Sequence, residues 1–78
     1  MYNINFHERL KNLRLQSGLT QDELAKKLHA CGCAATGKFA ISRYENNQRL
    51  PDVRSLAVIA GFFNVSVDYM LRIEEKKR

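Results

Sequence analysis

The segment Gly18-Leu19-Thr20-Gln21-Asp22-Glu23-Leu24 combines a helix end with a helix start. Gly18 tolerates the positive φ with which many helices terminate. Thr20 and Glu23 have the spacing of a capping box, in which the threonine hydroxyl caps the glutamate amide and the glutamate reaches back. Leu19 and Leu24 are placed to form a hydrophobic staple across the cap. The segment therefore predicts two helices joined by a tight turn.

Apolar residues recur at helical spacing on both sides of this turn. We expect a first helix over about residues 5–17, a second after Thr20, and a third over about 37–46. Asp52 and Ser66 are suitable N-caps for a fourth helix and a short fifth one. No strand is predicted. The fold class is all-α with five helices, in a domain over residues 1–73 followed by a basic tail over 74–78.

The formal net charge of +5, from 13 Lys and Arg against 8 Asp and Glu, favours a polyanionic partner. Basic side chains that neutralise phosphates release counterions, which makes nucleic acid such a partner. Part of this excess lies in the tail, where solvation of a chain end explains it equally well.

The third predicted helix separates into two faces when it is placed on a helical wheel. Five residues fall within an arc of about 140°: Lys38, Phe39, Ser42, Arg43 and Asn46. Ala40, Ile41 and Tyr44 lie on the opposite side and are the expected core face. The first face can read base edges, because Lys38 and Arg43 can donate to guanine and Phe39 can pack on a thymine methyl. It is also what any exposed helix shows, with Phe39 half-buried under the preceding loop.

Residues that flank this helix could contact phosphate. Gln21 begins the second helix, where its side-chain amide and the helix amides can meet a phosphate. The loop Asn46-Asn47-Gln48-Arg49 contains only uncharged or basic residues. Such a loop suits phosphate contacts, although asparagines are also plain turn formers.

Three motifs of the chain, in the right order, resemble the lambda-repressor and Cro-like (XRE-type) helix-turn-helix family. They are Leu19 to Ala25, Ile41-Ser42-Arg43-Tyr44-Glu45-Asn46, and Asn64 to Leu71. The resemblance implies a five-helix DNA-binding fold whose third helix enters the major groove. By position it assigns base reading to Lys38, Phe39, Ser42 and Arg43, and phosphate contacts to Gln21 and residues 46–49. It also implies a structural ion pair between Arg14 and Glu45.

The connector between the second and third helices is longer than in the compact form of this family. It holds His29, Cys31 and Cys33, followed by Thr36, which we predict as the N-cap of the third helix and as a phosphate contact. The cysteines could serve a metal or redox site, but structural zinc needs four ligands. Packing of small cysteines against a helix is the favoured interpretation, and no metal is predicted.

The sequence lacks the motifs that would indicate several other functions. There is no glycine-rich phosphate loop, nucleophile elbow or zinc-protease motif, so we expect no enzyme, cofactor or small-molecule ligand. No segment reaches the ~18 apolar residues that span a bilayer, and the first residues lack the features of a signal peptide. A cytoplasmic protein with no membrane partner is expected.

These inferences together predict a transcriptional regulator, expected to repress, that binds a double-stranded DNA operator as a homodimer. Phe62, Val65, Tyr69 and Ile73 offer apolar side chains for the dimer surface. The alternative is a protein-interaction module, an antitoxin or adaptor, that uses the same fold.

Overall fold

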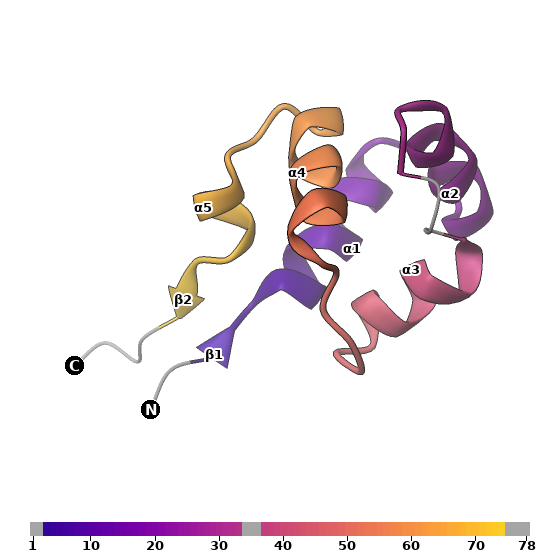
Figure 1. Cartoon of the computed structure of the whole chain (residues 1–78). Coiled ribbons are helices and arrows are strands. Elements are labelled where there is room, and N and C mark those ends of the chain that lie inside the picture. Colours follow the sequence, from indigo (N-terminus) through magenta and orange to yellow (C-terminus); the bar gives the residue numbers. More distant parts are fainter. Residues whose placement is uncertain (1–2, 34–36, 75–78) are drawn as a thin grey trace.

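The computed structural model describes residues 3–33 and 37–74, which form five helices and one short pair of strands. The helices are α1 (Phe6–Gln16), α2 (Gln21–Ala30), α3 (Lys38–Glu45), α4 (Val53–Phe62) and α5 (Val67–Met70). The strands are β1 (Asn3–Ile4) and β2 (Ile73–Glu74). In Figure 1, α2 and α3 lie at one end of the molecule and α5 at the other, with α1 and α4 between them. The predicted five-helix, all-α class is confirmed.

The predicted capping box is present at the start of α2. The Thr20 hydroxyl accepts a hydrogen bond of 3.0 Å from the Glu23 amide. The Glu23 carboxylate accepts one of 2.9 Å from the Thr20 amide. Gly18 has a φ of +72°, which is the left-handed conformation expected after a helix end. Local chemistry therefore fixes the turn between α1 and α2.

The other predicted N-caps are also in place. The Asp52 carboxylate accepts a hydrogen bond of 2.8 Å from the Ser55 amide and caps α4. The Ser66 hydroxyl accepts one of 2.9 Å from the Tyr69 amide and caps the short helix α5. Asn64, between these two helices, has a φ of +57° and ends α4, as its type predicts.

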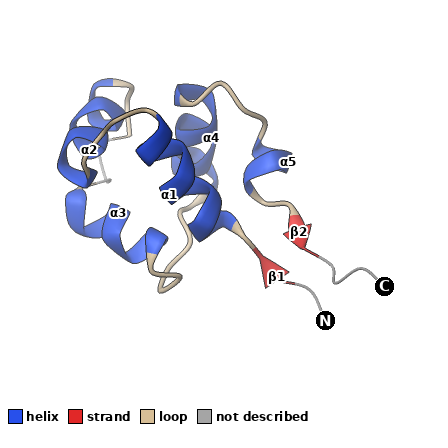
Figure 2. Ribbon diagram, turned by 180° about the vertical axis from the view of Figure 1, so that it is seen from behind, coloured by secondary structure: helices blue, strands red, loops and turns tan. Residues whose placement is uncertain are grey.

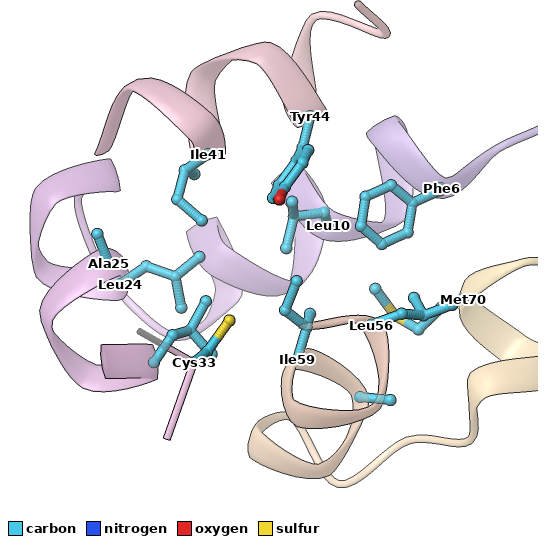
Figure 3. Close-up of a cluster of buried hydrophobic side chains, with 12 residues drawn as sticks. Phe6, Leu10, Leu24, Ala25, Cys33, Ile41, Tyr44, Leu56, Ile59 and Met70 are labelled. Atoms are coloured by element: carbon cyan, nitrogen blue, oxygen red, sulfur yellow. The ribbon is translucent and has the colours of Figure 1, made fainter. Parts of the chain in front are cut away.

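One hydrophobic core joins all five helices (Figure 3). Its largest fully buried side chains are Phe6, Leu10, Leu24, Leu28, Ile41, Ile59 and Met70. The Phe6 and Tyr44 rings meet edge to face, with centroids 6.1 Å apart, and so connect α1 to α3. Helix α3 packs on both α1 and α2, so its position depends on the two preceding helices.

The strands β1 and β2 pair antiparallel, with Asn3 opposite Glu74 and Ile4 opposite Ile73. Figure 2 shows the pair where the described parts of the two chain ends meet. The sequence predicted no strand, because two residues are too few to show an alternating pattern. Glu74, the first residue assigned to the basic tail, belongs to β2, and residues 75–78 lie outside the described part.

Candidate nucleic-acid interface

Helix α3 has the two faces that the helical wheel predicts. Ile41 is fully buried and Tyr44 is 4% exposed, so both point into the core. On the other side Lys38, Phe39 and Arg43 are exposed, and Ser42 is half-buried. Since α3 lies at the outer end of the molecule (Figure 1), this polar face is open to a large partner. We call Lys38, Phe39, Ser42 and Arg43 the outward face of α3.

The N-terminal end of α3 differs in one respect from the prediction. Thr36, the expected N-cap and phosphate contact, lies outside the described residues. The N-cap position is occupied by Gly37, which has extended backbone and makes no side-chain capping bond. Helix α3 therefore begins without the cap that sequence reasoning assigned to it.

Phe39 is 74% exposed although it is a large apolar residue. The interpretation that it lies half-buried under the preceding loop is therefore wrong. The ammonium nitrogen of Lys38 lies 5.6 Å from the centroid of its ring, within the range of a cation–π contact. The first turn of α3 thus presents an aromatic ring and a positive charge together.

Arg14 and Glu45 form an ion pair beneath this helix. The Arg14 Nε donates to Glu45 Oε2 at 2.6 Å, and Nη2 donates to Oε1 at 3.0 Å. Both residues are more than nine-tenths buried. The hydrogen bond to Glu45 raises the pKa of Arg14, against the opposing effect of burial, and the attraction of the carboxylate adds to it. The structure thus brings together the two residues that the resemblance paired.

Two further hydrogen bonds extend this pair into the helix-turn-helix unit. Arg14 Nη1 donates to the Leu19 carbonyl at 2.8 Å, in the turn between α1 and α2. The Gln21 side-chain nitrogen donates to Glu45 Oε1 at 3.1 Å. Glu45 therefore links the end of α3 to both α1 and the first residue of α2. We call Arg14, Gln21 and Glu45 the clamp.

Gln21 has a second amide hydrogen that its bond to Glu45 does not use. Its side chain is half-buried at the N-terminus of α2, and the bond to Glu45 fixes its amide group beside α3. Sequence reasoning placed Gln21 at the interface but missed this bond. The signal was the carboxylate of Glu45, which can accept more hydrogen bonds than one arginine supplies.

The predicted phosphate loop, Asn46 to Arg49, is exposed along its whole length. Asn47 has a φ of +60°, and the Gln48 amide donates to the Arg43 carbonyl at 2.9 Å to close the end of α3. The Asn46 side chain donates to the Ser42 hydroxyl at 3.4 Å. The asparagines thus act as turn formers, while the side chains of Gln48 and Arg49 remain in solvent.

The residues expected at a dimer surface lie at the far end of the molecule from α3. Phe62, Val65 and Tyr69 are half-buried and pack on the core, and Ile73 belongs to β2. The Tyr69 ring lies 4.8 Å from the Arg9 guanidinium carbon and 5.8 Å from that of Arg72. The side chains of Phe62, Val65 and Tyr69 are therefore already engaged in the fold, with only part of their surface left over.

The two cysteines have different surroundings. Cys33 is 2% exposed and belongs to the hydrophobic core (Figure 3). Cys31 is exposed and directly follows α2. Among the described residues no three His, Cys, Asp or Glu side chains are grouped to hold a metal. No helix in the described part is both long and apolar enough to cross a membrane.

Comparison with known proteins gives consistent matches. The model of the helix-turn-helix family matches residues 10–70. The transcriptional activator BcrR of Enterococcus faecalis is 36% identical over 72 residues, which are 92% of this chain and 32% of BcrR. The transcriptional regulator ImmR of Bacillus subtilis is 38% identical over 68 residues, 87% of this chain and 49% of ImmR. This chain thus spans about a third of the length of BcrR and about half of that of ImmR.

Proposed function

Because the chain belongs to the helix-turn-helix family, we propose that it regulates transcription by binding a specific sequence in double-stranded DNA. Helix α3 lies in the major groove, with Lys38, Phe39, Ser42 and Arg43 facing the base edges. The observation that carries this proposal is the outward face of α3, which has donors and one aromatic ring exposed over a buried, apolar inner face.

Phosphate contacts flank this face on two sides. Gln21 donates its second amide hydrogen to a phosphate at the N-terminus of α2, and residues 46–49 approach the backbone after α3. Thr36 is proposed as a further contact from the connector. These contacts fix the register of α3 in the groove, and they carry no sequence information themselves.

The clamp supports the proposal through geometry. Arg14 and Gln21 hold Glu45 from two other helices, at 2.6 and 3.1 Å. Because Glu45 is the last residue of α3, these bonds tie the C-terminal end of the groove-reading helix to α1 and α2. Base reading needs side chains that are held rigidly, since loss of geometry costs affinity.

We further infer a homodimer that binds a palindromic operator with two α3 helices about 34 Å apart, one turn of DNA. The exposed parts of Phe62, Val65 and Tyr69, with Ile73, are the candidate contact surface. Repression is the proposed mode, because a protein bound to an operator that overlaps a promoter blocks polymerase by occupying its site. The site of action is the bacterial cytoplasm, where such DNA lies.

The test is selection of bound duplexes from a random library, followed by fluorescence anisotropy of the selected duplex and a scrambled one at several salt concentrations. We expect a palindromic motif and a linear fall of log K with log salt, about 0.9 per phosphate neutralised. Binding without sequence enrichment or salt dependence would contradict the proposal. It would favour the alternative of an antitoxin or adaptor whose partner is a protein.

A further inference from the structure

The first turn of α3 carries an exposed aromatic ring beside a positive charge. Of the large apolar side chains that are exposed in the described residues, only Phe39 belongs to the outward face of α3, and it is 74% exposed. Lys38, the first residue of the helix, holds its ammonium 5.6 Å from the ring centroid. Neither side chain supports the core, so the pair is available to a ligand.

The major groove offers few apolar groups to such a ring. Of the four base edges, only thymine presents a methyl group there, and its O4 acceptor is the neighbouring group on the same edge. A ring that contacts the methyl therefore leaves an adjacent ammonium beside an acceptor. Cytosine places an amino donor at the position of O4, which faces an ammonium unfavourably.

From this match we infer that Lys38 and Phe39 together read one thymine in each half of the operator, Phe39 through the methyl and Lys38 through O4. The inference rests on the proposed function, since it requires α3 to enter the major groove. It goes further because it assigns a base to a named pair of residues. Arg43 and Ser42 are left to read other positions.

Deoxyuridine tests this inference because it lacks only the thymine methyl. Each thymine of the selected operator is replaced singly by deoxyuridine, and the affinity is measured by fluorescence anisotropy for the wild type and Phe39→Ala. We expect one thymine per half-site whose replacement weakens the wild type about fourfold, the effect of burying one methyl-sized group. The Phe39→Ala variant should bind the two duplexes equally.

A second base substitution, at the same position of the operator, tests the role of Lys38. Replacing the thymine·adenine pair by 5-methylcytosine·guanine keeps the methyl and exchanges the acceptor for a donor. The wild type should lose affinity on this duplex, and the loss should shrink in Lys38→Met. Val53→Ala is the matched control, because Val53 is 84% exposed but belongs to α4, and it should behave as the wild type.

The outcomes separate the two proposals. A flat deoxyuridine scan in a protein that still selects an operator overturns the thymine assignment and leaves the proposed function intact. A deoxyuridine effect that persists in Phe39→Ala also overturns it, because another residue then reads the methyl. Failure to enrich any duplex overturns both. Since Phe39 is exposed, an unchanged melting temperature should confirm that Phe39→Ala is folded.

Discussion

Arg14 Nε and Glu45 Oε2 lie 2.6 Å apart, in an ion pair that joins α1 to the last residue of α3. Only 10% of the Arg14 side chain and 3% of the Glu45 side chain are exposed, so little water is present to screen the two charges. Three donors, two from Arg14 and one from Gln21, satisfy the carboxylate. The fold therefore tolerates a buried charge at the point where α3 must be held.

Removing one partner of this pair should destabilise the fold strongly. Glu45→Ala leaves the Arg14 guanidinium buried without its carboxylate, and we expect a loss of about 3 kcal/mol in the free energy of unfolding. Urea denaturation followed by circular dichroism measures it. Asp22→Ala is the matched control, because Asp22 pairs with Lys26 at 3.3 Å on an exposed surface. Its loss should stay below about 1 kcal/mol, and equal losses would show that the buried pair has no special role.

The N-cap of α4 should make stability depend on acid pH. The hydrogen bond from the Ser55 backbone amide lowers the pKa of Asp52, with help from Arg54 and Arg49. A carboxylate whose pKa is lowered by folding stabilises the fold above its unfolded value of about 3.9, and this contribution disappears as the pH falls through the lower folded value. Melting temperatures of the wild type and Asp52→Asn should therefore converge between pH 6 and pH 2. A constant difference would refute the assignment.

Gln21→Ala should weaken DNA binding without changing sequence preference. It removes the proposed phosphate donor and the bond to Glu45, so affinity should fall about tenfold, as expected for one hydrogen bond to a charged group. Because phosphate contacts do not depend on the bases, and because Arg14 still makes two hydrogen bonds to Glu45, operator and scrambled duplex should be affected alike. Gln16→Ala, an exposed glutamine at the end of α1, is the control. Unchanged binding by Gln21→Ala would remove its phosphate role.

The two cysteines should differ in reactivity toward a thiol reagent. Cys31 is exposed and should be labelled in the native protein, whereas Cys33 is 2% exposed and should react only after unfolding. Mass spectrometry should therefore find one label under native conditions and two in denaturant. Rapid double labelling of the folded protein would contradict the burial of Cys33 in the core.

Local chemistry made much of this fold predictable. Thr20 and Glu23 carry a capping signal in their own types and spacing, and the structure has both bonds. The division of α3 into a core face with Tyr44 and an outward face with Arg43 follows from helical geometry in the same way. These features depend on neighbours within a few residues, which a sequence shows directly.

Features that depend on distant contacts were harder to predict. The bond between Gln21 and Glu45 spans 24 residues and exists only because α2 and α3 pack together. The pairing of Ile4 with Ile73 likewise requires the complete fold to bring the chain ends together. The Arg14–Glu45 pair was expected only through a family resemblance, since residue types alone do not choose among the acids that Arg14 could meet.

Comparison of wild type and Arg43→Ala on the selected operator and on a scrambled duplex tests the central claim, that α3 reads bases in the major groove. Arg43 is exposed on the outward face of α3, and removing the hydrogen bonds that we propose it makes to a guanine should cost about 1–3 kcal/mol on the operator. Binding to the scrambled duplex should weaken much less, so the ratio between the two affinities should fall. An equal loss of affinity on both duplexes would contradict direct reading by Arg43.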